Sequence, residues 1–431
     1  MQHFVGRSSR NRRVSALETP NSAATKILSK VERLNEETVR IENAICQVLA
    51  IDITSRIDIP HWNNSAMDGY AALAADLEGA PPHELRIVDY IPAGSFPSKS
   101  LGTGECARVF TGAPVPDNAD TVIRQEDTSG EGSETVLIDD LRDVGRNIRK
   151  RGEDVKKGEL VLPAGTELGP AEIGMLASLG EFDVPVYRKP VVAIMGSGDE
   201  IADRDERSEI LAGKKIGTSN TYALAALVRE NGGEPLVLGV GRDDPEDLKK
   251  LLLKASQADL IITTAGVSVG EHDFLHQVLE ELDTDRVFWR IQMRPGSPVV
   301  FGTVGKFGGT PWIGLPGNPV STLVTFELFV RPTMRKMMGH RLLFRDTTQV
   351  SVKEPIQLGP KLTHFLRVKL ERTERGVTAA LTGGQGSGIL SSMLHADGLL
   401  IIPPNQPHTP ADTTMPAIVL NDHRHVENCP W

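Results

Sequence analysis

The spacing of apolar and polar residues changes several times along the chain. From Val191 onward, short β-branched apolar runs alternate with stretches whose apolar residues recur at helical spacing. Strands that alternate with helices in this way are typical of a three-layer α/β/α domain around a parallel sheet. We therefore predict strands at 191–195, 236–238, 260–263, 287–291 and 312–315, and helices at 221–230, 245–255, 274–282 and 320–338.

Two further regions have the pattern of short strands separated by turn-forming residues. The first predicts a small β domain and the second a β-barrel-like C-terminal domain. Before the first of these regions, apolar residues recur at helical spacing, and we expect two short helices within residues 24–49. The predicted strands lie at 85–90, 106–110, 121–124 and 135–138, and then at 349–352, 363–370, 376–381 and 398–402.

A chain of 431 residues is too long for a single hydrophobic core, so several domains are expected. The first residues are basic and poor in acids, which fits a targeting peptide or, as we favour, a flexible tail. The predicted division is a tail at 1–25, a split linking domain at 26–60 and 146–187, a small β domain at 61–145, an α/β domain at 188–340 and a C-terminal β domain at 341–431.

Charge and cysteine content exclude some classes of function. The formal net charge of −10 argues against non-specific binding of nucleic acid. The three cysteines have no metal-ligand spacing, which fits a reducing compartment. No apolar run reaches the roughly 18 residues of a membrane span, and the apolar core of a secretory signal is missing. We expect a cytoplasmic protein that does not enter a membrane.

One candidate site is a glycine-containing turn between a predicted strand and a predicted helix. Gly266 and Gly270 would let backbone N–H groups approach an anion at the start of the helix. Glu271 and Asp273 lie in the same turn and would hold a hard cation such as Mg²⁺ beside that anion. The alternative is an ordinary tight turn whose acids favour the helix dipole.

Turns with Gly, Asp or Asn follow four predicted strands, at 196–200, 241–245, 266–273 and 314–321. The carboxyl ends of parallel strands share one edge of a sheet, so these turns predict a shared anion site. In the last turn Asn318 is also a good N-cap and Pro319 a good first helical residue, which leaves helix capping as the alternative.

Cationic and polar clusters are the remaining candidates. Arg290 and Arg294 would share one face if they lay on one strand, and would suit an oxyanion; two surface arginines are the alternative. Each of the other clusters has a structural alternative in a solvated face, a self-capped loop or a hairpin tip. They are the basic run at 145–154, the polar loop at 57–71 and the glycine-rich loop at 383–392.

Six short motifs occur in one order along the chain. They are NSAMDGYA at 64–71, TGAP at 111–114, the basic run ending in Glu-Asp at 149–154, SGDE at 197–200, GVSVGE at 266–271 with Asp273, and LPGNP at 315–319. In this order they resemble the molybdopterin molybdenumtransferase family, which is related to the E domain of gephyrin. The resemblance extends over about residues 30 to 430.

The resemblance implies a reaction in molybdenum cofactor biosynthesis. Molybdate would be inserted into adenylylated molybdopterin in a Mg²⁺-dependent step, with release of AMP. It also implies a homodimer whose active site lies between the α/β domain of one protomer and parts of the other. Other proteins of cofactor biosynthesis stay open as partners.

Functional residues follow from the same resemblance. Those implied as catalytic are Asp68, Thr111, Asp154, Glu200, Asp243 and Asp273, with Glu200, Asp243 and Asp273 at the metal. Those implied to bind substrate or molybdate are Gly266, Ser268, Gly270, Glu271, Arg290, Arg294, Ser297, Pro316, Asn318 and Pro319.

Three departures from the family pattern keep an alternative open. The family usually has lysine at Arg290 and Arg294 and commonly at Ser297. It has a glycine pair where Ala265 stands, and often a Ser-Thr pair where Gly196 precedes Ser197. A divergent non-catalytic paralogue, acting as a molybdopterin-binding or scaffold protein, would tolerate these changes. Because all five candidate acids are present, we favour catalysis. A molybdopterin adenylyltransferase would resemble the α/β domain alone, so the two β regions argue against it.

Overall fold

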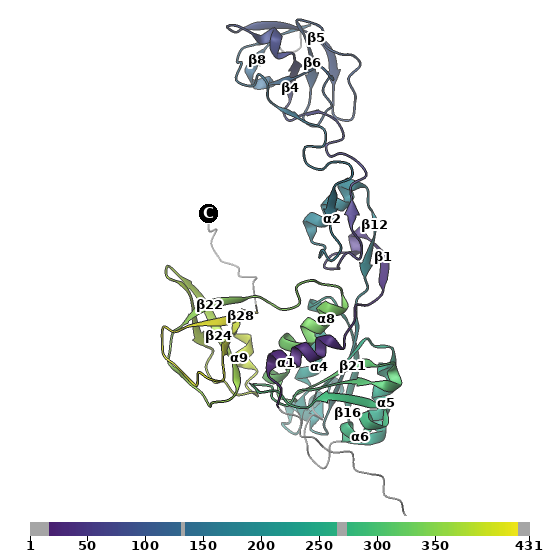
Figure 1. Ribbon diagram of the computed structural model, residues 1–431, viewed down its shortest axis with the longest axis vertical. Helices are drawn as coiled ribbons and strands as arrows, with labels where there is room; N and C mark the ends of the chain where they lie inside the picture. The colour runs from purple at the N-terminus through teal and green to yellow at the C-terminus, as the bar shows by residue number, and fades with distance from the viewer. Residues whose placement is uncertain (1–16, 131–133, 265–273, 421–431) are drawn as a thin grey trace, which may run out of the picture.

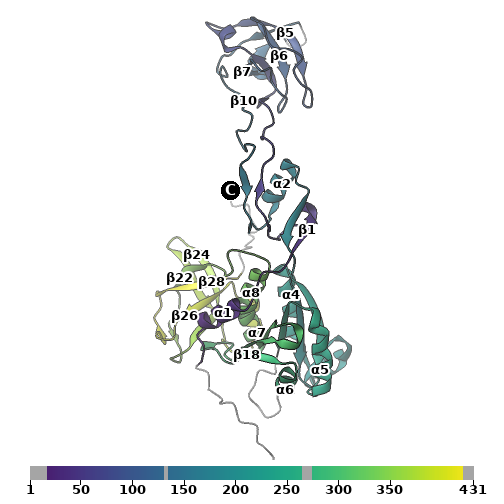
Figure 2. The ribbon, with the colours of Figure 1, turned by 45° about the vertical axis from the view of Figure 1, so that its right-hand side comes forward.

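The structure is a computed structural model and describes residues 17–130, 134–264 and 274–420. The molecule is elongated (Figure 1). A small β domain lies at one end, a linking region follows, and an α/β domain and a C-terminal β domain lie side by side at the other end; the turned view agrees (Figure 2). Within the described ranges, no helix has the length and apolar character needed to cross a membrane.

The α/β domain contains a six-stranded sheet in the order β16-β13-β17-β21-β20-β18. The first four strands are parallel and match four predicted strands, whereas β20 pairs antiparallel with both β21 and β18. Strand β20 was not predicted, and β18 ends earlier than the predicted 287–291. The bounds are β13 Val191–Ser197, β16 Glu234–Gly241, β17 Leu260–Thr264, β18 Thr284–Phe288, β20 Val300–Val304 and β21 Thr310–Leu315.

Helices cover both faces of this sheet, as predicted for three layers. Ile262 of β17 packs in the core formed with α1, α4, α7 and α8, whereas its neighbour Ile261 packs in the core formed with α5 and α6. Alternate residues of a strand point to opposite faces, so a continuous apolar run serves both cores. The helices are α1 Pro20–Ser29, α4 Ser219–Glu230, α5 Pro245–Leu253, α6 Phe274–Glu281, α7 Pro319–Thr325 and α8 Arg331–Met337, with a π-helical turn Phe326–Val330 before α8.

The N-terminal helix begins inside the segment predicted as a flexible tail. The Thr19 hydroxyl accepts a hydrogen bond from the Ser22 N–H (3.2 Å), and Pro20 occupies the first turn, a favourable helix start. Ala23 and Ile27 are buried in the core of the α/β domain. Packing on a distant part of the chain therefore holds this helix in place.

The linking region corrects one prediction. The second helix expected within residues 24–49 is instead β1 (Glu36–Arg40) followed by a single 3-10 turn. Strand β1 pairs antiparallel with β12 (Asp183–Tyr187). Val39 and Ile41 are two residues apart, a spacing that also fits a strand, and the long-range pairing decides between the two. The region also contains β2 (Ile53–Thr54), β11 (Leu160–Leu162) and α2 (Pro170–Leu179).

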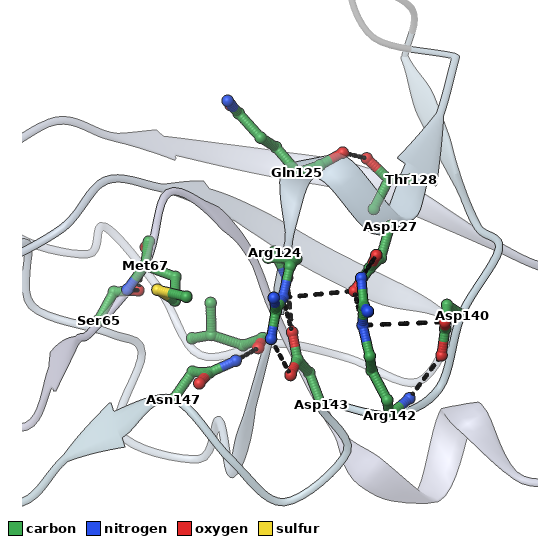
Figure 3. Close-up of polar contacts among 11 residues, drawn as sticks. Ser65, Met67, Arg124, Gln125, Asp127, Thr128, Asp140, Arg142, Asp143 and Asn147 are labelled. Atoms are coloured by element: carbon green, nitrogen blue, oxygen red, sulfur yellow. Dashed lines mark hydrogen bonds and ion pairs between the residues drawn. The ribbon is translucent and has the colours of Figure 1, made fainter.

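The small β domain has a six-stranded sheet in the order β7-β4-β6-β5-β9-β8, and its four predicted strands are confirmed. Ion pairs between buried aspartates and more exposed arginines brace one side of it (Figure 3). Arg124 donates to both carboxylate oxygens of Asp143 (2.7 and 2.9 Å), and Arg142 pairs with Asp127. The strands are β4 Gly69–Ala72, β5 His83–Ile91, β6 Glu105–Val109, β7 Thr121–Arg124, β8 Thr128–Ser129 and β9 Thr135–Ile138.

The C-terminal domain is a closed barrel, as the sequence pattern indicated. Its strands follow the order β24-β25-β22-β28-β26, and β26 pairs with β24 to close it. The four predicted strands are confirmed and β28 is additional. The bounds are β22 Thr347–Val352, β24 Thr363–Thr373, β25 Gly376–Leu381, β26 Gly398–Ile402 and β28 Thr414–Val419.

Candidate functional site

The carboxyl ends of β13 and β16 form the first part of the site. The Gly198 N–H donates to the Gly241 carbonyl oxygen (3.2 Å), which ties the two strand ends together. Gly198 has φ +133°, and a Cβ there would lie 2.8 Å from a carboxylate oxygen of Glu200. Only glycine fits this turn, because a side chain would be strained and would displace Glu200.

Three acids gather at these strand ends, and they repel one another. The Asp243 N–H donates to a carboxylate oxygen of Asp199 (3.3 Å). Partial burial, and then the negative charges of Asp199 and Glu200, raise the pKa of Asp243 above its ordinary value. Asp199 lies in the SGDE motif but was not selected as a site residue. The arrangement favours a cation that would offset this charge.

The described residues do not by themselves form a finished metal site. In the part of the chain that the structure describes, no group of three or more acids, histidines or cysteines has the geometry of a metal cage. Of the predicted metal set, Glu200 and Asp243 lie at the strand ends, whereas Asp273 is outside the described residues. Magnesium binding at these acids therefore stays a prediction.

The predicted glycine turn also lies outside the described residues. Its flanking elements are confirmed, since β17 ends at Thr264 and α6 begins at Phe274. The predicted residues in this turn are Gly266, Ser268, Gly270, Glu271 and Asp273.

The start of α7 forms the next wall. Asn318 occupies the N-cap position and Pro319 the first turn, as predicted, but within the described chain the Asn318 side chain makes no capping hydrogen bond. Asn220 at the start of α4 donates to the Gly317 carbonyl oxygen (2.7 Å). The Val320 N–H donates to the Ser387 carbonyl oxygen (3.1 Å). The polar Asn318 side chain is thus exposed beside two segments that hold the turn from either side.

Ser387 belongs to the glycine-rich loop at 383–392, which a buried arginine holds against the barrel. Arg367 is 0% exposed and donates to the Gly386 carbonyl oxygen and to the Ser392 hydroxyl (both 3.1 Å). The loop is therefore part of the wall near α7 and more than a hairpin tip. Arg367 was missed, although an arginine inside the apolar strand HFLRVKL was a signal for it.

The prediction that Arg290 and Arg294 share one face of a strand is wrong. Strand β18 ends at Phe288, so Arg290 lies outside it, whereas Arg294 belongs to β19 (Met293–Arg294), which pairs with β24 of the barrel. Both side chains are exposed. The chain leaves the sheet here to reach the neighbouring domain. The Ser297 hydroxyl donates to the Ile291 carbonyl oxygen (2.8 Å) and so fixes the bend.

Asp68 and Thr111 form a second, separate group on the small β domain. One Asp68 carboxylate oxygen accepts hydrogen bonds from the Thr111 N–H (2.7 Å) and the Thr111 hydroxyl (2.8 Å). These bonds, helped by the nearby charge of Arg108, hold the pKa of Asp68 below its ordinary value. Just before Asp68, the Ser65 hydroxyl donates to the Met67 carbonyl oxygen (Figure 3).

The basic run lies next to the polar loop, between the small β domain and the linking region. Strand β10 (Ile148–Arg149) pairs with β3 (Asn64–Ser65). The Arg151 N–H donates to the Asn63 side-chain oxygen (2.9 Å), and its guanidinium pairs with Asp58 (2.7 Å). The Asp154 N–H donates to the Ile59 carbonyl oxygen (3.1 Å), and Asp154 is exposed. This brings Asp154 beside the polar loop.

The predicted catalytic residues therefore fall into separate groups within one chain. Asp68 and Thr111 lie on the small β domain at one end of the molecule, and Glu200 and Asp243 lie on the α/β domain at the other (Figures 1 and 2). Residues of the linking region lie between them.

Comparison with known families covers most of the described chain. Residues 19–180 match the MoeA N-terminal region (domain I and II), residues 193–336 a probable molybdopterin binding domain, and residues 349–419 the MoeA C-terminal region (domain IV). The middle match contains the acids at the ends of β13 and β16.

Individual relatives agree. A molybdopterin molybdenumtransferase of Nostoc sp. is 40% identical over 70% of this chain and 70% of its own length. One of Staphylococcus aureus is 32% identical over 88% of this chain and 90% of its own length. The crystal structure of the molybdopterin biosynthesis moeA protein from Pyrococcus horikoshii OT3 is 31% identical, covers 94% of this chain and 100% of its own, and superposes with a TM-score of 0.78. The fold, the ordered motifs and these relatives together show that the chain belongs to the molybdopterin molybdenumtransferase family.

Proposed function

We propose that this protein transfers molybdenum to molybdopterin: it inserts molybdate into adenylylated molybdopterin and releases AMP. The observation that carries the proposal is the acid cluster of Asp199, Glu200 and Asp243 at the carboxyl ends of parallel strands. It lies within the segment that matches a probable molybdopterin binding domain. Ligands of open α/β sheets bind at such strand ends.

Magnesium fits this cluster chemically. Mg²⁺ prefers carboxylate oxygens. Partial burial, and then the negative charges of Asp199 and Glu200, raise the pKa of Asp243, and a divalent cation would offset that negative charge. Glu200 and Asp243, with Asp199 beside them and Asp273 from the neighbouring turn, would hold it. When bound, Mg²⁺ would neutralise charge on the pyrophosphate that is cleaved. The protein's part is to fix these acids, which the Gly198 turn and the Gly198–Gly241 bond do.

Molybdate is an oxyanion and needs cationic partners. Arg290 and Arg294 are exposed on the segment that crosses from the α/β domain to the barrel. Each guanidinium group could bind two oxygen atoms of the oxyanion. Ser297 donates to a backbone carbonyl, so its hydroxyl supports the bend between the two arginines. Its lack of charge is compatible with a site that already contains two cations. Gly266, Ser268, Gly270 and Glu271, with Pro316, Asn318 and Pro319, would line the remaining substrate surface.

A homodimer would bring the separate catalytic groups together. Within one chain, Asp68 and Thr111 lie at the opposite end of the molecule from Glu200 and Asp243 (Figure 1). A two-fold arrangement of elongated protomers would place the small β domain of one beside the α/β domain of its partner. Asp68, Thr111 and Asp154 would then complete the partner's site, and we infer that the dimer acts in the cytoplasm.

The test is a direct assay. Purified protein is mixed with adenylylated molybdopterin, Mg²⁺ and micromolar molybdate, and AMP release and active cofactor are followed. Molybdate-dependent release of AMP is the expected result. Omitting molybdate or adding excess EDTA should each abolish it.

Two other outcomes would contradict the proposal. Tight binding of adenylylated molybdopterin without AMP release would favour the divergent binding or scaffold protein, with Ser297 the first position to examine. Restoring a lysine with Ser297→Lys would then test whether lost charge is the reason. No binding at all would mean that the family fold is retained without this activity.

A further inference from the structure

Arg108 is a buried cation directly behind the Asp68–Thr111 pair, and none of the functions discussed so far uses it. It lies on β6, three residues before Thr111, and is 7% exposed. Arginine is seldom buried to this degree without a specific set of partners. Its contacts therefore indicate what it does.

The guanidinium group contacts the backbone on both sides of the pair. Its Nη1 donates to the Gly69 carbonyl oxygen (3.0 Å) and to the Val109 carbonyl oxygen (3.2 Å). Gly69 is the first residue of β4 and directly follows Asp68. Val109 is the last residue of β6 and lies two residues before Thr111. One rigid group thus joins the two strand ends that carry Asp68 and Thr111.

A second route leads from Arg108 to Asp68 itself. Its Nη2 donates to the Gln125 side-chain oxygen (2.5 Å), and the Gln125 N–H donates to the Asp68 carbonyl oxygen (3.0 Å). Gln125 follows Arg124, whose guanidinium is fixed by both carboxylate oxygens of Asp143 (Figure 3). The backbone of Asp68 is therefore held from two neighbouring segments.

Two aromatic rings fix the plane of the guanidinium. Its central carbon lies 5.1 Å from the centre of the Tyr70 ring and 4.6 Å from that of the Phe110 ring. Phe110 directly precedes Thr111, and Tyr90 packs edge-on against it with ring centres 5.4 Å apart. Such cation–π contacts stabilise a desolvated guanidinium group and restrict its orientation.

The three hydrogen-bond acceptors of Arg108 are neutral, so its charge is not cancelled by them. We propose that Arg108 is a positioning residue of the active site: it holds Asp68 and Thr111 at their hydrogen-bonding distance and directs a positive field at the Asp68 carboxylate. The inference rests on the proposed function only in placing Asp68 and Thr111 at the reacting substrate. The lowered pKa of Asp68, to which Arg108 contributes, agrees with it.

The main test replaces Arg108 by glutamine and by lysine. Because a small displacement of catalytic groups costs up to about a hundredfold in rate, we expect Arg108→Gln to lower kcat by roughly 10- to 100-fold with little change in KM. Arg108→Lys keeps the charge but loses the fork of donors, and should recover part of the loss. The matched control is Arg86→Gln on the neighbouring strand β5, where the arginine is exposed and pairs with Glu105; its kcat should stay within about twofold.

A double-variant cycle separates positioning from a general effect on folding. If Arg108 acts through Asp68, then Arg108→Gln should cost little further activity in an Asp68→Asn background. Multiplied losses in the double variant, or an Arg108→Gln enzyme with wild-type kcat, would overturn the proposal. If Arg108→Gln fails to fold, Gln125→Met removes one acceptor at a half-buried side chain and should show a smaller loss of the same kind.

Hydrogen exchange gives a readout that does not depend on activity. The Thr111 amide donates to Asp68, and its protection should fall at least about tenfold in Arg108→Gln and stay unchanged in Arg86→Gln. Unchanged protection of Thr111 would overturn the inference even if the enzyme were active. If the wild-type protein released no AMP but Thr111 protection still fell in Arg108→Gln, the proposed function would be contradicted and the role of Arg108 in holding the pair would stand.

Discussion

The two acid-bearing regions at opposite ends of the molecule differ in how their charges are balanced. Asp68 accepts two hydrogen bonds from Thr111 and has the cation of Arg108 nearby, and its pKa is lowered. Asp243 faces Asp199 and Glu200, and its pKa is raised. The carboxylate of the first region is already paired within the chain, whereas the second region carries repulsion that a bound cation would relieve.

This difference indicates a division of labour. A carboxylate that is already hydrogen-bonded is preorganised, and it can orient a substrate without rearrangement. A crowded group of carboxylates is unfavourable when empty and gains most from a divalent cation. The comparison can therefore be tested by substituting an acid in either region. The Asp68 and Asp243 regions should respond differently to the same substitution.

The largest expected effect is on turnover. Asp68→Ala and Asp243→Ala should each lower the rate of AMP release by about 10²-fold, because each removes a fixed group from charged reaction chemistry. If the site forms between protomers, an equal mixture of the two inactive variants, unfolded and refolded together, should recover up to about a quarter of the wild-type rate. The quarter arises because half of the dimers are mixed and one of their two sites is intact.

The control is each variant refolded alone, which should stay inactive. A mixture that stays inactive, although size-exclusion chromatography and mass spectrometry show mixed dimers, would mean that both ends do not serve one site. Asp154→Ala, at the polar loop, should behave like Asp68→Ala in the same mixing test.

The second effect is on binding of the metal. Mg²⁺ at about ten times its Kd should stabilise the wild-type protein by about 1.4 kcal/mol, a rise in Tm of about 1–2 degrees for a chain of this length. Asp68→Asn should keep this shift, because Asp68 is not among the acids assigned to Mg²⁺, whereas Asp243→Asn should lose most of it. Differential scanning calorimetry with and without MgCl₂ measures both. Equal shifts in the two variants would contradict the assignment of Mg²⁺ to the Asp243 end.

Much of the fold could be predicted because local pattern and final environment agree. Strand β17 is an unbroken apolar run because both of its faces are buried, and its sequence reveals this. Strand β1 is mostly exposed, so its residues carry little pattern, and only pairing with β12, far along the chain, makes it a strand. Strand β28, which shares the barrel core through Ala417 and Met415, contains a proline that obscured its pattern.

The candidate site likewise contains residues that could be predicted from the sequence and residues that could not. The acids near glycine turns could be found, since parallel strands bring their carboxyl ends to one edge. The geometry of Arg290 and Arg294 could not, because the bend between β18 and β19 follows from the position of a neighbouring domain. Arg108 and Arg367 were missed for a related reason. Their partners are backbone carbonyls and rings brought near by tertiary folding, which no spacing in the sequence encodes.

The third effect is on stability without ligand. Asp68→Asn weakens the acceptor for two Thr111 hydrogen bonds and should destabilise the protein by about 1 kcal/mol, allowing for its exposure. Asp243→Asn removes repulsion and should be neutral or slightly stabilising, by a few tenths of a kcal/mol. Urea unfolding of both variants in EDTA at pH 7 measures the difference. A larger loss in Asp243→Asn than in Asp68→Asn would contradict the contrast between the two ends.

The smallest effect is on how the stability of each variant, relative to the wild-type protein, depends on pH. The sign of this dependence differs between Asp68→Asn and Asp243→Asn. The pKa of Asp68 is lowered from the ordinary value of 3.8, so its contribution to stability is present above that value and is lost as pH falls through the lowered pKa. The pKa of Asp243 is raised from 3.8, so the folded protein is favoured below 3.8, and this advantage is lost as pH rises through the raised pKa. Asp243→Asn should therefore gain on the wild-type protein as pH rises from 3.8 through the raised pKa of Asp243. Asp68→Asn should fall behind the wild-type protein as pH rises through the lowered pKa of Asp68, and the gap should stay constant above 3.8. Parallel profiles for the two variants would mean that their carboxylates experience similar fields, and the contrast between the two ends would fail.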